Sequence, residues 1–104
     1  MLTVKELLIK AKSLIETPET WTQGTYAKDA NGQSVTSFST EATQFCAMGA
    51  IRRATSCDAA TFQRDKCYMA IRNAAGMDLT DYNDTNDHMA VMAIFDKAIA
   101  NCKE

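Results

Sequence analysis

The sequence lacks the features that mark export, membrane insertion or nucleic-acid binding. No window approaches the roughly 18 consecutive apolar residues of a spanning helix, and the N-terminus has no apolar stretch of signal-peptide length. The formal net charge is -2, with 11 Lys and Arg against 13 Asp and Glu, so no basic excess predicts contact with DNA or RNA. We therefore expect a cytoplasmic protein that binds neither nucleic acid nor membrane directly.

Residues that could hold a metal are also scarce. There is one histidine, His88, and the cysteines form no CxxC pair, so the usual ligand spacing of a zinc site is missing. Asp81-x-Asn83-x-Thr85 begins like a calcium loop, but its twelfth position is Met92 instead of the glutamate that closes such a loop. We expect no metal and no cofactor. The four cysteines are Cys46, Cys57, Cys67 and Cys102.

Proline and glycine are few, and no linker-like or low-complexity segment divides the chain. At 104 residues, with 46% hydrophobic residues, the chain is long enough to bury one core and too short for two. The sequence predicts a single globular domain over residues 1–104.

The N-terminal segment predicts an amphipathic helix. Thr3-Val4-Lys5-Glu6 fits a capping box, and apolar residues follow it at helical spacing. The helix should end near Glu16, because Pro18 disfavours helical geometry at the residue before it.

A β-hairpin should follow this helix. Residues 20–27 and 33–38 are rich in aromatic and β-branched residues, and they flank a turn in which Asn31 or Gly32 can adopt a positive φ. A lone hairpin is marginal in water, so it must pack on the helices. The expected contacts are Trp21, Tyr26 and Phe38.

The stretch around which the chain is organised is Phe45-Cys46-Ala47-Met48-Gly49-Ala50-Ile51, which has no charged or amide side chain. It predicts a buried central helix over residues 40–55, capped by Ser37 or Ser39. A glycine inside a helix costs roughly 1 kcal/mol relative to alanine. Gly49 therefore indicates that another backbone passes close to this helix.

Two more helices complete the predicted fold. The third is capped by Asp58 and ended by Gly76, and the fourth follows an acidic loop over residues 77–85 and is capped by Asp84 or Thr85. The fold class is α+β, a four-helix bundle-like domain with one β-hairpin between helices 1 and 2. The predicted buried stripes are Phe62, Met69, Ala70 and Ala74 in the third helix and Met89, Met92, Phe95, Ile99 and Cys102 in the fourth.

Three short motifs occur along the chain: W-x-Q-G at residues 21–24, C-A-x-G-A-I-x-R-A at residues 46–54, and the dipeptide Asn83-Asp84. In this order they resemble a family of small uncharacterised domains found in phages, prophages and actinobacteria, over about residues 21–100. One position departs from the pattern, since Tyr82 stands where a tryptophan is expected. The resemblance implies an origin in mobile genetic elements, with the host cytoplasm as location if the protein is phage-encoded. It implies no reaction.

These motifs also suggest a ligand site. A guanidinium beside an aromatic face and a glycine can hold a planar anionic group such as a nucleotide. In the alternative interpretation Trp21 covers the core and Arg53 pairs with Asp84, without a ligand. The candidate ligand-binding residues are Trp21, Gln23, Gly24, Arg53, Asn83 and Asp84.

Two functional classes follow. The preferred one is a small non-enzymatic binding protein, a phage-type accessory or counter-defence factor that occupies a host protein or sequesters a small anionic, nucleotide-like ligand; self-association as a homo-oligomer stays open. The alternative is a small cysteine-dependent hydrolase using Cys46 and His88. Cys46 is expected two turns into the central helix and buried, where a thiol behaves as a small hydrophobe.

Overall fold

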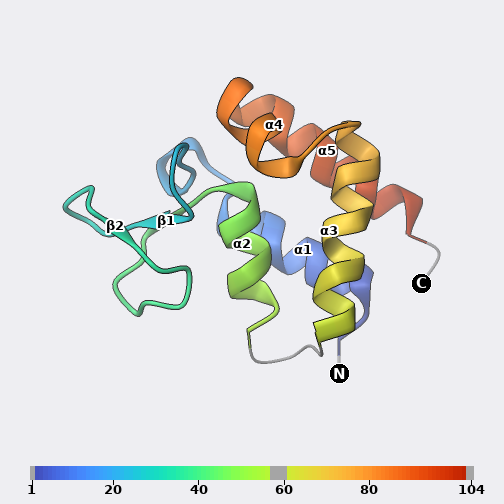
Figure 1. Ribbon diagram of the computed structural model, residues 1–104, viewed down its shortest axis with the longest axis horizontal. Coiled ribbons are helices and arrows are strands. Elements are labelled where there is room, and N and C mark those ends of the chain that lie inside the picture. Colours follow the sequence, from blue (N-terminus) through green and yellow to red (C-terminus); the bar gives the residue numbers. More distant parts are fainter. Residues whose placement is uncertain (1, 57–60, 103–104) are drawn as a thin grey trace.

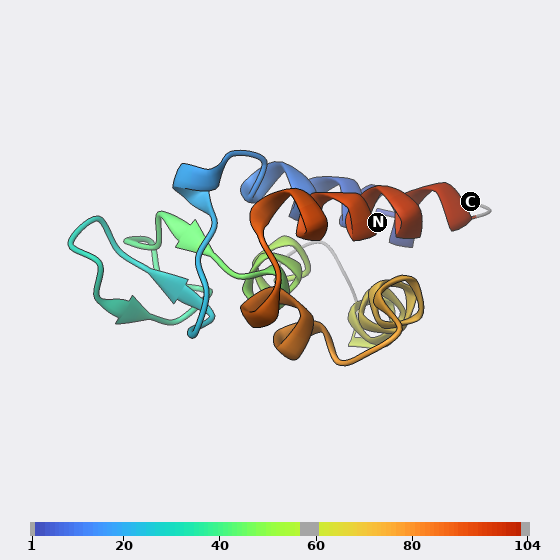
Figure 2. The same cartoon turned by 90° about the horizontal axis from the view of Figure 1, so that it is seen from above.

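The computed structural model describes residues 2–56 and 61–102, which form helices in two layers with a small sheet at one end (Figures 1 and 2). The mixed α+β class is confirmed. The four-helix bundle with one hairpin is not, because the described residues hold five α-helices and a three-stranded sheet. The elements are α1 (Val4–Leu14), the 3-10 turn η1 (Pro18–Thr20), β1 (Ala27–Lys28), β2 (Ser34–Val35), β3 (Gln44–Phe45), α2 (Ala47–Ala54), α3 (Thr61–Ala75), α4 (Leu79–Thr85) and α5 (His88–Asn101).

The core lies between the two helical layers. Helices α1 and α5 lie side by side in one layer and α2 and α3 form the other, with α4 next to α2 (Figure 2). Burial of large apolar side chains from four of these helices is the main source of stability. The fully buried ones include Leu7, Leu8, Ile51, Ile71, Val91 and Phe95.

Helix α1 begins with the predicted capping box. Thr3 Oγ1 accepts a hydrogen bond from the amide of Glu6 (3.1 Å), and Glu6 Oε1 accepts one from the amide of Thr3 (3.0 Å). The helix ends at Leu14, with Ile15 as its C-cap, so the predicted end near Glu16 is close to the observed one.

The sheet has the order β2-β1-β3, and both pairs are antiparallel. The predicted turn joins β1 and β2, and Gly32 has the expected positive φ of 80°. Asp29 Oδ1 accepts hydrogen bonds from the amides of Asn31 (2.9 Å) and Gln33 (3.0 Å), which fixes the turn. The strands are much shorter than predicted, with two residues each.

The prediction that the central helix begins near residue 40 is wrong, since α2 begins at Ala47. Gln44 and Phe45 form β3 instead, where they pair with β1. The amide of Cys46 then donates to the carbonyl oxygen of Tyr26 (3.1 Å). This tertiary pairing of residues 44–46 with β1 and Tyr26 overrides the helical pattern of the sequence.

Cys46 therefore occupies the N-cap of α2, a role predicted for Ser37 or Ser39. Its Sγ accepts a hydrogen bond from the amide of Gly49 (3.3 Å). The close backbone contact inferred from Gly49 is confirmed, because a Cβ added there would overlap the Tyr26 carbonyl oxygen and lie 2.9 Å from its carbonyl carbon.

The predicted acidic loop over residues 77–85 is mostly helix α4. Asp78 caps it, since Asp78 Oδ1 accepts from the amides of Thr80 (3.0 Å) and Asp81 (3.3 Å). The cap of α5 is Asp87, which accepts from the amide of Ala90 (2.9 Å), so the predicted caps Asp84 and Thr85 are wrong. Asp78 and Asp87 thus cap two successive helices.

The buried faces of the last helices also differ from prediction. Phe62 and Met69 of α3 are 57% and 54% exposed, and Met89 of α5 is 79% exposed, whereas Phe95 is buried as predicted. Gly76, with a φ of 74°, follows the end of α3 as expected. The predicted cap Asp58 lies outside the described residues. The buried apolar residues are Cys67, Ile71 and Ala74 in α3, and Val91, Ile94, Phe95 and Ala98 in α5.

Candidate functional site

Five of the six candidate site residues meet where residues 21–24 pass α4. Trp21 Nε1 donates a hydrogen bond to Asn83 Oδ1 (2.7 Å), and the amide of Gly24 donates to Asp84 Oδ1 (3.0 Å). Gln23 Nε2 donates to the carbonyl oxygens of Asn83 (3.0 Å) and Asn86 (2.9 Å). The W-x-Q-G and Asn-Asp motifs are thus two sides of one junction.

Asn83 is the centre of this junction and is completely buried. In addition to Trp21, its Oδ1 accepts from the amide of Ala47 (2.9 Å), the first residue of α2. Its Nδ2 donates to the Thr22 carbonyl oxygen and to Asp84 Oδ1, both at 3.1 Å. An asparagine amide has two donor protons and two acceptor lone pairs, so all of its capacity is used inside the protein. Asn83 therefore holds three segments together and has nothing left for a ligand.

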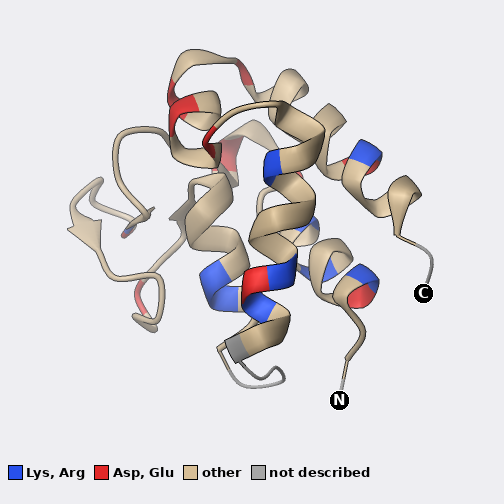
Figure 3. Cartoon of the chain, turned by 45° about the vertical axis from the view of Figure 1, so that its right-hand side comes forward, with Lys and Arg blue, Asp and Glu red and all other residues tan. Residues whose placement is uncertain are grey.

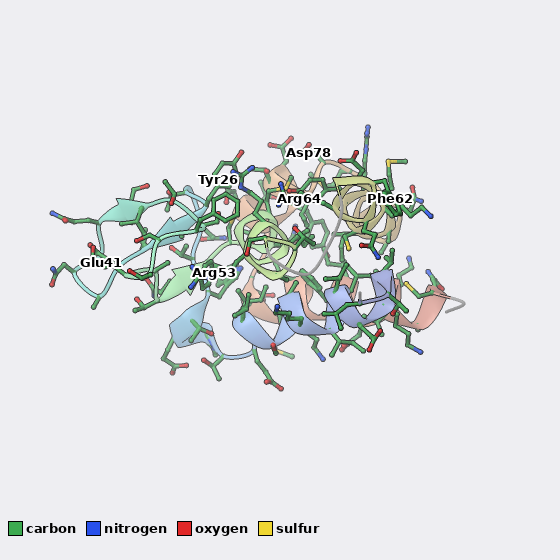
Figure 4. The ribbon with its side chains drawn as sticks, turned by 90° about the horizontal axis from the view of Figure 1, so that it is seen from below. Tyr26, Glu41, Arg53, Phe62, Arg64 and Asp78 are labelled. Atoms are coloured by element: carbon green, nitrogen blue, oxygen red, sulfur yellow. The ribbon has the colours of Figure 1, made fainter. Side chains whose placement is uncertain are left out.

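Arg53 does not join the junction. It lies in the last turn of α2, at the opposite end of the helix from Ala47. Its Nη1 donates to the carbonyl oxygens of Ser37 (2.9 Å) and Ser39 (2.8 Å), and its guanidinium lies 5.8 Å from the centre of the Phe45 ring. Figure 4 shows Arg53 on the side of α2 toward the strands. Arg53 therefore holds the segment after β2 in place through hydrogen bonds, and it pairs with neither Trp21 nor Asp84.

His88, the other half of the suggested hydrolase pair, packs against the tryptophan. Its ring and that of Trp21 meet edge to face, with centres 5.7 Å apart. Its Nε2 lies 2.7 Å from the Ile15 carbonyl oxygen, so this nitrogen carries a proton and donates it. No hydrogen bond joins His88 to Cys46 within residues 2–56 and 61–102. The two side chains do not form a nucleophile and base pair in this geometry.

Cys46 has the helix N-terminal position that favours a reactive thiolate, contrary to the prediction that it lies two turns into its helix. The surroundings of the Cys46 side chain nevertheless disfavour the thiolate. The residue is 2% exposed, burial raises the pKa of the Cys46 thiol, and the negative charge of Asp84 adds to the increase. The hydrogen bond from the Gly49 amide acts in the opposite direction and is the smaller effect.

We expect Cys46 to react slowly with iodoacetamide in the folded protein, because a raised pKa lowers the thiolate fraction at neutral pH and burial blocks access. Peptide mass spectrometry after timed labelling at pH 7.5 should find Cys102, which is partly exposed, modified before Cys46. Unfolding in denaturant should make the two rates similar. Faster labelling of Cys46 than of Cys102 in the native state would revive the hydrolase hypothesis. Cys57 lies outside the described residues.

A second cluster of side chains was not predicted from the sequence. We call it the arginine–aromatic patch, and it consists of Tyr26, Phe38, Arg52, Arg64 and Tyr68. The Arg52 guanidinium lies 5.2 Å from the Tyr26 ring centre and 5.1 Å from the Phe38 ring centre. Arg64 lies 6.0 Å from the Phe38 ring. Tyr26 and Phe38 thus contact the helices as predicted, but through these arginines and at the surface, since they are 47% and 44% exposed.

The patch is positively charged. Burial raises the pKa of the Tyr68 phenol, and the charges of Arg64 and Arg52 beside it oppose that increase. Figure 3 shows Lys and Arg gathered where the end of α2 meets the first half of α3, and Asp and Glu gathered around α4. Only the spacing of Arg64 and Tyr68 by four residues on one helix was visible in the sequence. The remaining members come from separate elements.

The described part of the chain holds no group of three His, Cys, Asp or Glu side chains arranged to bind a metal ion. Within that part there is also no helix long and apolar enough to cross a membrane.

Comparison with known proteins places the chain in a family. Neither the curated proteins nor the solved structures contain a significant match to this chain. A model described as a family of unknown function (DUF6197) matches residues 1–101. This agrees with the resemblance to an uncharacterised family, and it carries no information about a phage or actinobacterial origin. Because the match covers almost the whole sequence, the chain belongs to this family of unknown function.

Proposed function

We propose that this protein is a non-enzymatic binding protein that occupies an acidic surface of a partner protein through the arginine–aromatic patch. The observation that supports this most is the position of Arg52 between two rings that remain almost half exposed. A phage-type accessory or counter-defence factor that occupies a host protein would act in this way.

The composition of the patch is that of an interface. Tyrosine, phenylalanine and arginine are enriched at protein–protein contacts, where rigid rings supply apolar area and guanidinium groups recognise carboxylates. Stacking of Arg52 on Tyr26 and Phe38 restrains its side chain before binding, so less conformational entropy is lost when a partner arrives. Contiguous apolar surface rimmed by polar or charged groups is typical of protein–protein contact sites.

The positive charge of the arginine–aromatic patch indicates that the partner surface is negatively charged. Among the described residues, no carboxylate forms an ion pair with Arg52 or Arg64. Arg64 is held by Thr55, through Nε to Oγ1 (2.8 Å) and Nη2 to the carbonyl oxygen (3.5 Å), and both partners are neutral. The positive charge therefore stays available for an anionic group of the partner. The same chemistry would accept a small nucleotide-like anion, which the experiment must separate from a protein-like polyanion.

The test uses poly-L-glutamate as a protein-like carboxylate partner and ATP as a small anion, with binding measured by calorimetry at low salt. We expect Arg52→Gln and Arg64→Gln each to weaken poly-L-glutamate binding by about tenfold, because each removes a charge-assisted contact. Arg72→Gln is the matched control, since Arg72 is an exposed arginine of α3 outside the patch and its loss changes the net charge equally.

An equal loss of binding in Arg72→Gln would mean that only the net charge is sensed, and the patch would not be a site. Saturable ATP binding that is stronger than poly-L-glutamate binding, and lost in Arg52→Gln, would assign the patch to a small anionic ligand. Circular dichroism melts of all variants should coincide with the wild type, since the three arginines are not deeply buried.

A further inference from the structure

A cavity of about 290 Å³ lies next to the patch, between residues 24–26 and α4. Its lining residues are Gly24, Thr25, Tyr26, Cys46, Thr80 and Asp84. Tyr26 belongs to both features, because its ring contacts Arg52 in the patch while the residue also lines the cavity. Figure 4 labels Tyr26 on the upper side of the molecule, the side on which Arg64 also lies. A partner bound to the patch would therefore lie close to the cavity.

The wall of the cavity combines apolar surface with one charge. Tyr26 and Cys46 are the largely apolar residues of the lining, and Thr25 and Thr80 are its hydroxyl-bearing residues. The carboxylate of Asp84 is the charged group of the lining. A cavity of this size is at the lower limit for small-molecule sites, which span roughly 300 to 1,000 Å³, and it suits a single side chain better than a nucleotide.

Asp84 is oriented but not neutralised. Its Oδ1 accepts hydrogen bonds from the amide of Gly24 (3.0 Å) and from Asn83 Nδ2 (3.1 Å), so the carboxylate is held in one position. Its Oδ2 has no hydrogen-bond partner within residues 2–56 and 61–102, and no lysine or arginine of that part forms an ion pair with it. A fixed carboxylate without a counter-charge, at the wall of a mostly apolar cavity, is complementary to a cation on an apolar stem.

We propose that this cavity binds a basic side chain, lysine or arginine, of the partner protein, placing its cationic head against Asp84 and its methylene stem along Tyr26. The identity of the occupant as a partner side chain rests on the proposed function, whereas the cavity's preference for a cation does not. Together the two features select a partner surface on which a basic side chain lies next to carboxylates.

The probe is a capped arginine, N-acetyl-arginine amide, and its matched control is N-acetyl-citrulline amide, which has nearly the same shape and no charge. Titration of isotopically labelled protein, followed by amide chemical shifts, should give saturable shifts at Gly24, Thr80 and Asp84 with a Kd on the order of 1 to 10 mM for capped arginine. Capped citrulline should bind at least about tenfold more weakly, because it cannot pair with the carboxylate.

Two variants test the assignment. Asp84→Asn removes the charge and keeps an oxygen for the Gly24 and Asn83 donors, and it should weaken capped-arginine binding about tenfold. Thr80→Leu fills the cavity from α4 without changing Asp84, and it should abolish binding even if Asp84→Asn proves unstable. Equal binding of the two probes, or shifts that leave Gly24 and Thr80 unaffected, would overturn the proposal.

Arg64→Gln separates this inference from the proposed function. It should weaken binding to poly-L-glutamate and leave capped-arginine binding unchanged, because Arg64 contacts Phe38 and Thr55, and neither of these residues lines the cavity. Failure of the cavity assay with a working patch would reject the inference alone. Failure of the patch assay with a working cavity would reject the proposed function and leave a cation site without a defined partner surface.

Discussion

Replacing Gly49 with alanine is expected to lower the free energy of unfolding by about 3 kcal/mol, because the added methyl group would overlap a backbone carbonyl. The Tyr26 carbonyl oxygen in its way also accepts a hydrogen bond from the Cys46 amide (3.1 Å), so it cannot move without breaking the link between the sheet and α2. The better helix propensity of alanine offsets only about 1 kcal/mol of this loss. Urea denaturation followed by circular dichroism measures the difference.

Gly32→Ala is the control for this prediction. Gly32 has a positive φ of 80°, and a Cβ added there would meet open space, so alanine has a backbone cost of about 1 kcal/mol and no steric one. A larger loss for Gly49→Ala than for Gly32→Ala would show that backbone proximity is decisive. A Gly49→Ala protein as stable as the wild type would mean that the Tyr26 segment does not lie against α2.

Asn83→Ala is expected to destabilise the protein by about 3 to 5 kcal/mol. The substitution leaves the Trp21 indole N–H and the Ala47 amide without their acceptor, and an unsatisfied buried donor costs roughly 1 to 3 kcal/mol. It also removes the donor to the Thr22 carbonyl oxygen. Denaturation gives the free energy, and Trp21 fluorescence should shift to longer wavelength in the folded variant as the indole loses its partner and gains water.

The matched control is Asn86→Ala, at a neighbouring asparagine whose Nδ2 donates to the Tyr82 carbonyl oxygen (3.0 Å) and to Thr85 Oγ1 (3.3 Å) near the surface. Water can replace these contacts, so the expected loss is below about 1.5 kcal/mol with unchanged Trp21 emission. Similar losses in the two variants would contradict the central role assigned to Asn83.

The junction around Asn83 changes what the shared motifs mean. The sequence suggested Trp21, Gln23 and Gly24 as one wall of a ligand site, with Arg53 as its cation. In the structure their polar groups hydrogen-bond to Asn83, Asp84 and Asn86. A short motif of tryptophan, glutamine and glycine looks the same in a sequence whether its residues bind a ligand or a neighbouring segment of the chain. Burial and partners distinguish the two interpretations, and neither is visible in a sequence.

The sequence was sufficient to predict those features that depend on interactions between residues close together in the chain. The Thr3 and Glu6 box, the positive φ of Gly32 and the helix end at Gly76 depend on residues within one turn, and all three are confirmed. Gly49 also pointed to a close backbone, because no other benefit offsets a glycine inside a helix. The mixed α+β class follows from the same local patterns.

Tertiary pairing decided the rest. Residues 44–46 carry a helical pattern but belong to the sheet, since β1 offers them hydrogen bonds that the sequence alone cannot show. For the same reason Cys46 lies at the N-cap of α2 and not inside the helix. Arg53 lies away from the junction and donates to the carbonyl oxygens of Ser37 and Ser39. The arginine–aromatic patch and the cavity at Asp84 each combine side chains from elements far apart in the chain. Their positions depend on how the two layers and the sheet pack, which local residue patterns do not specify.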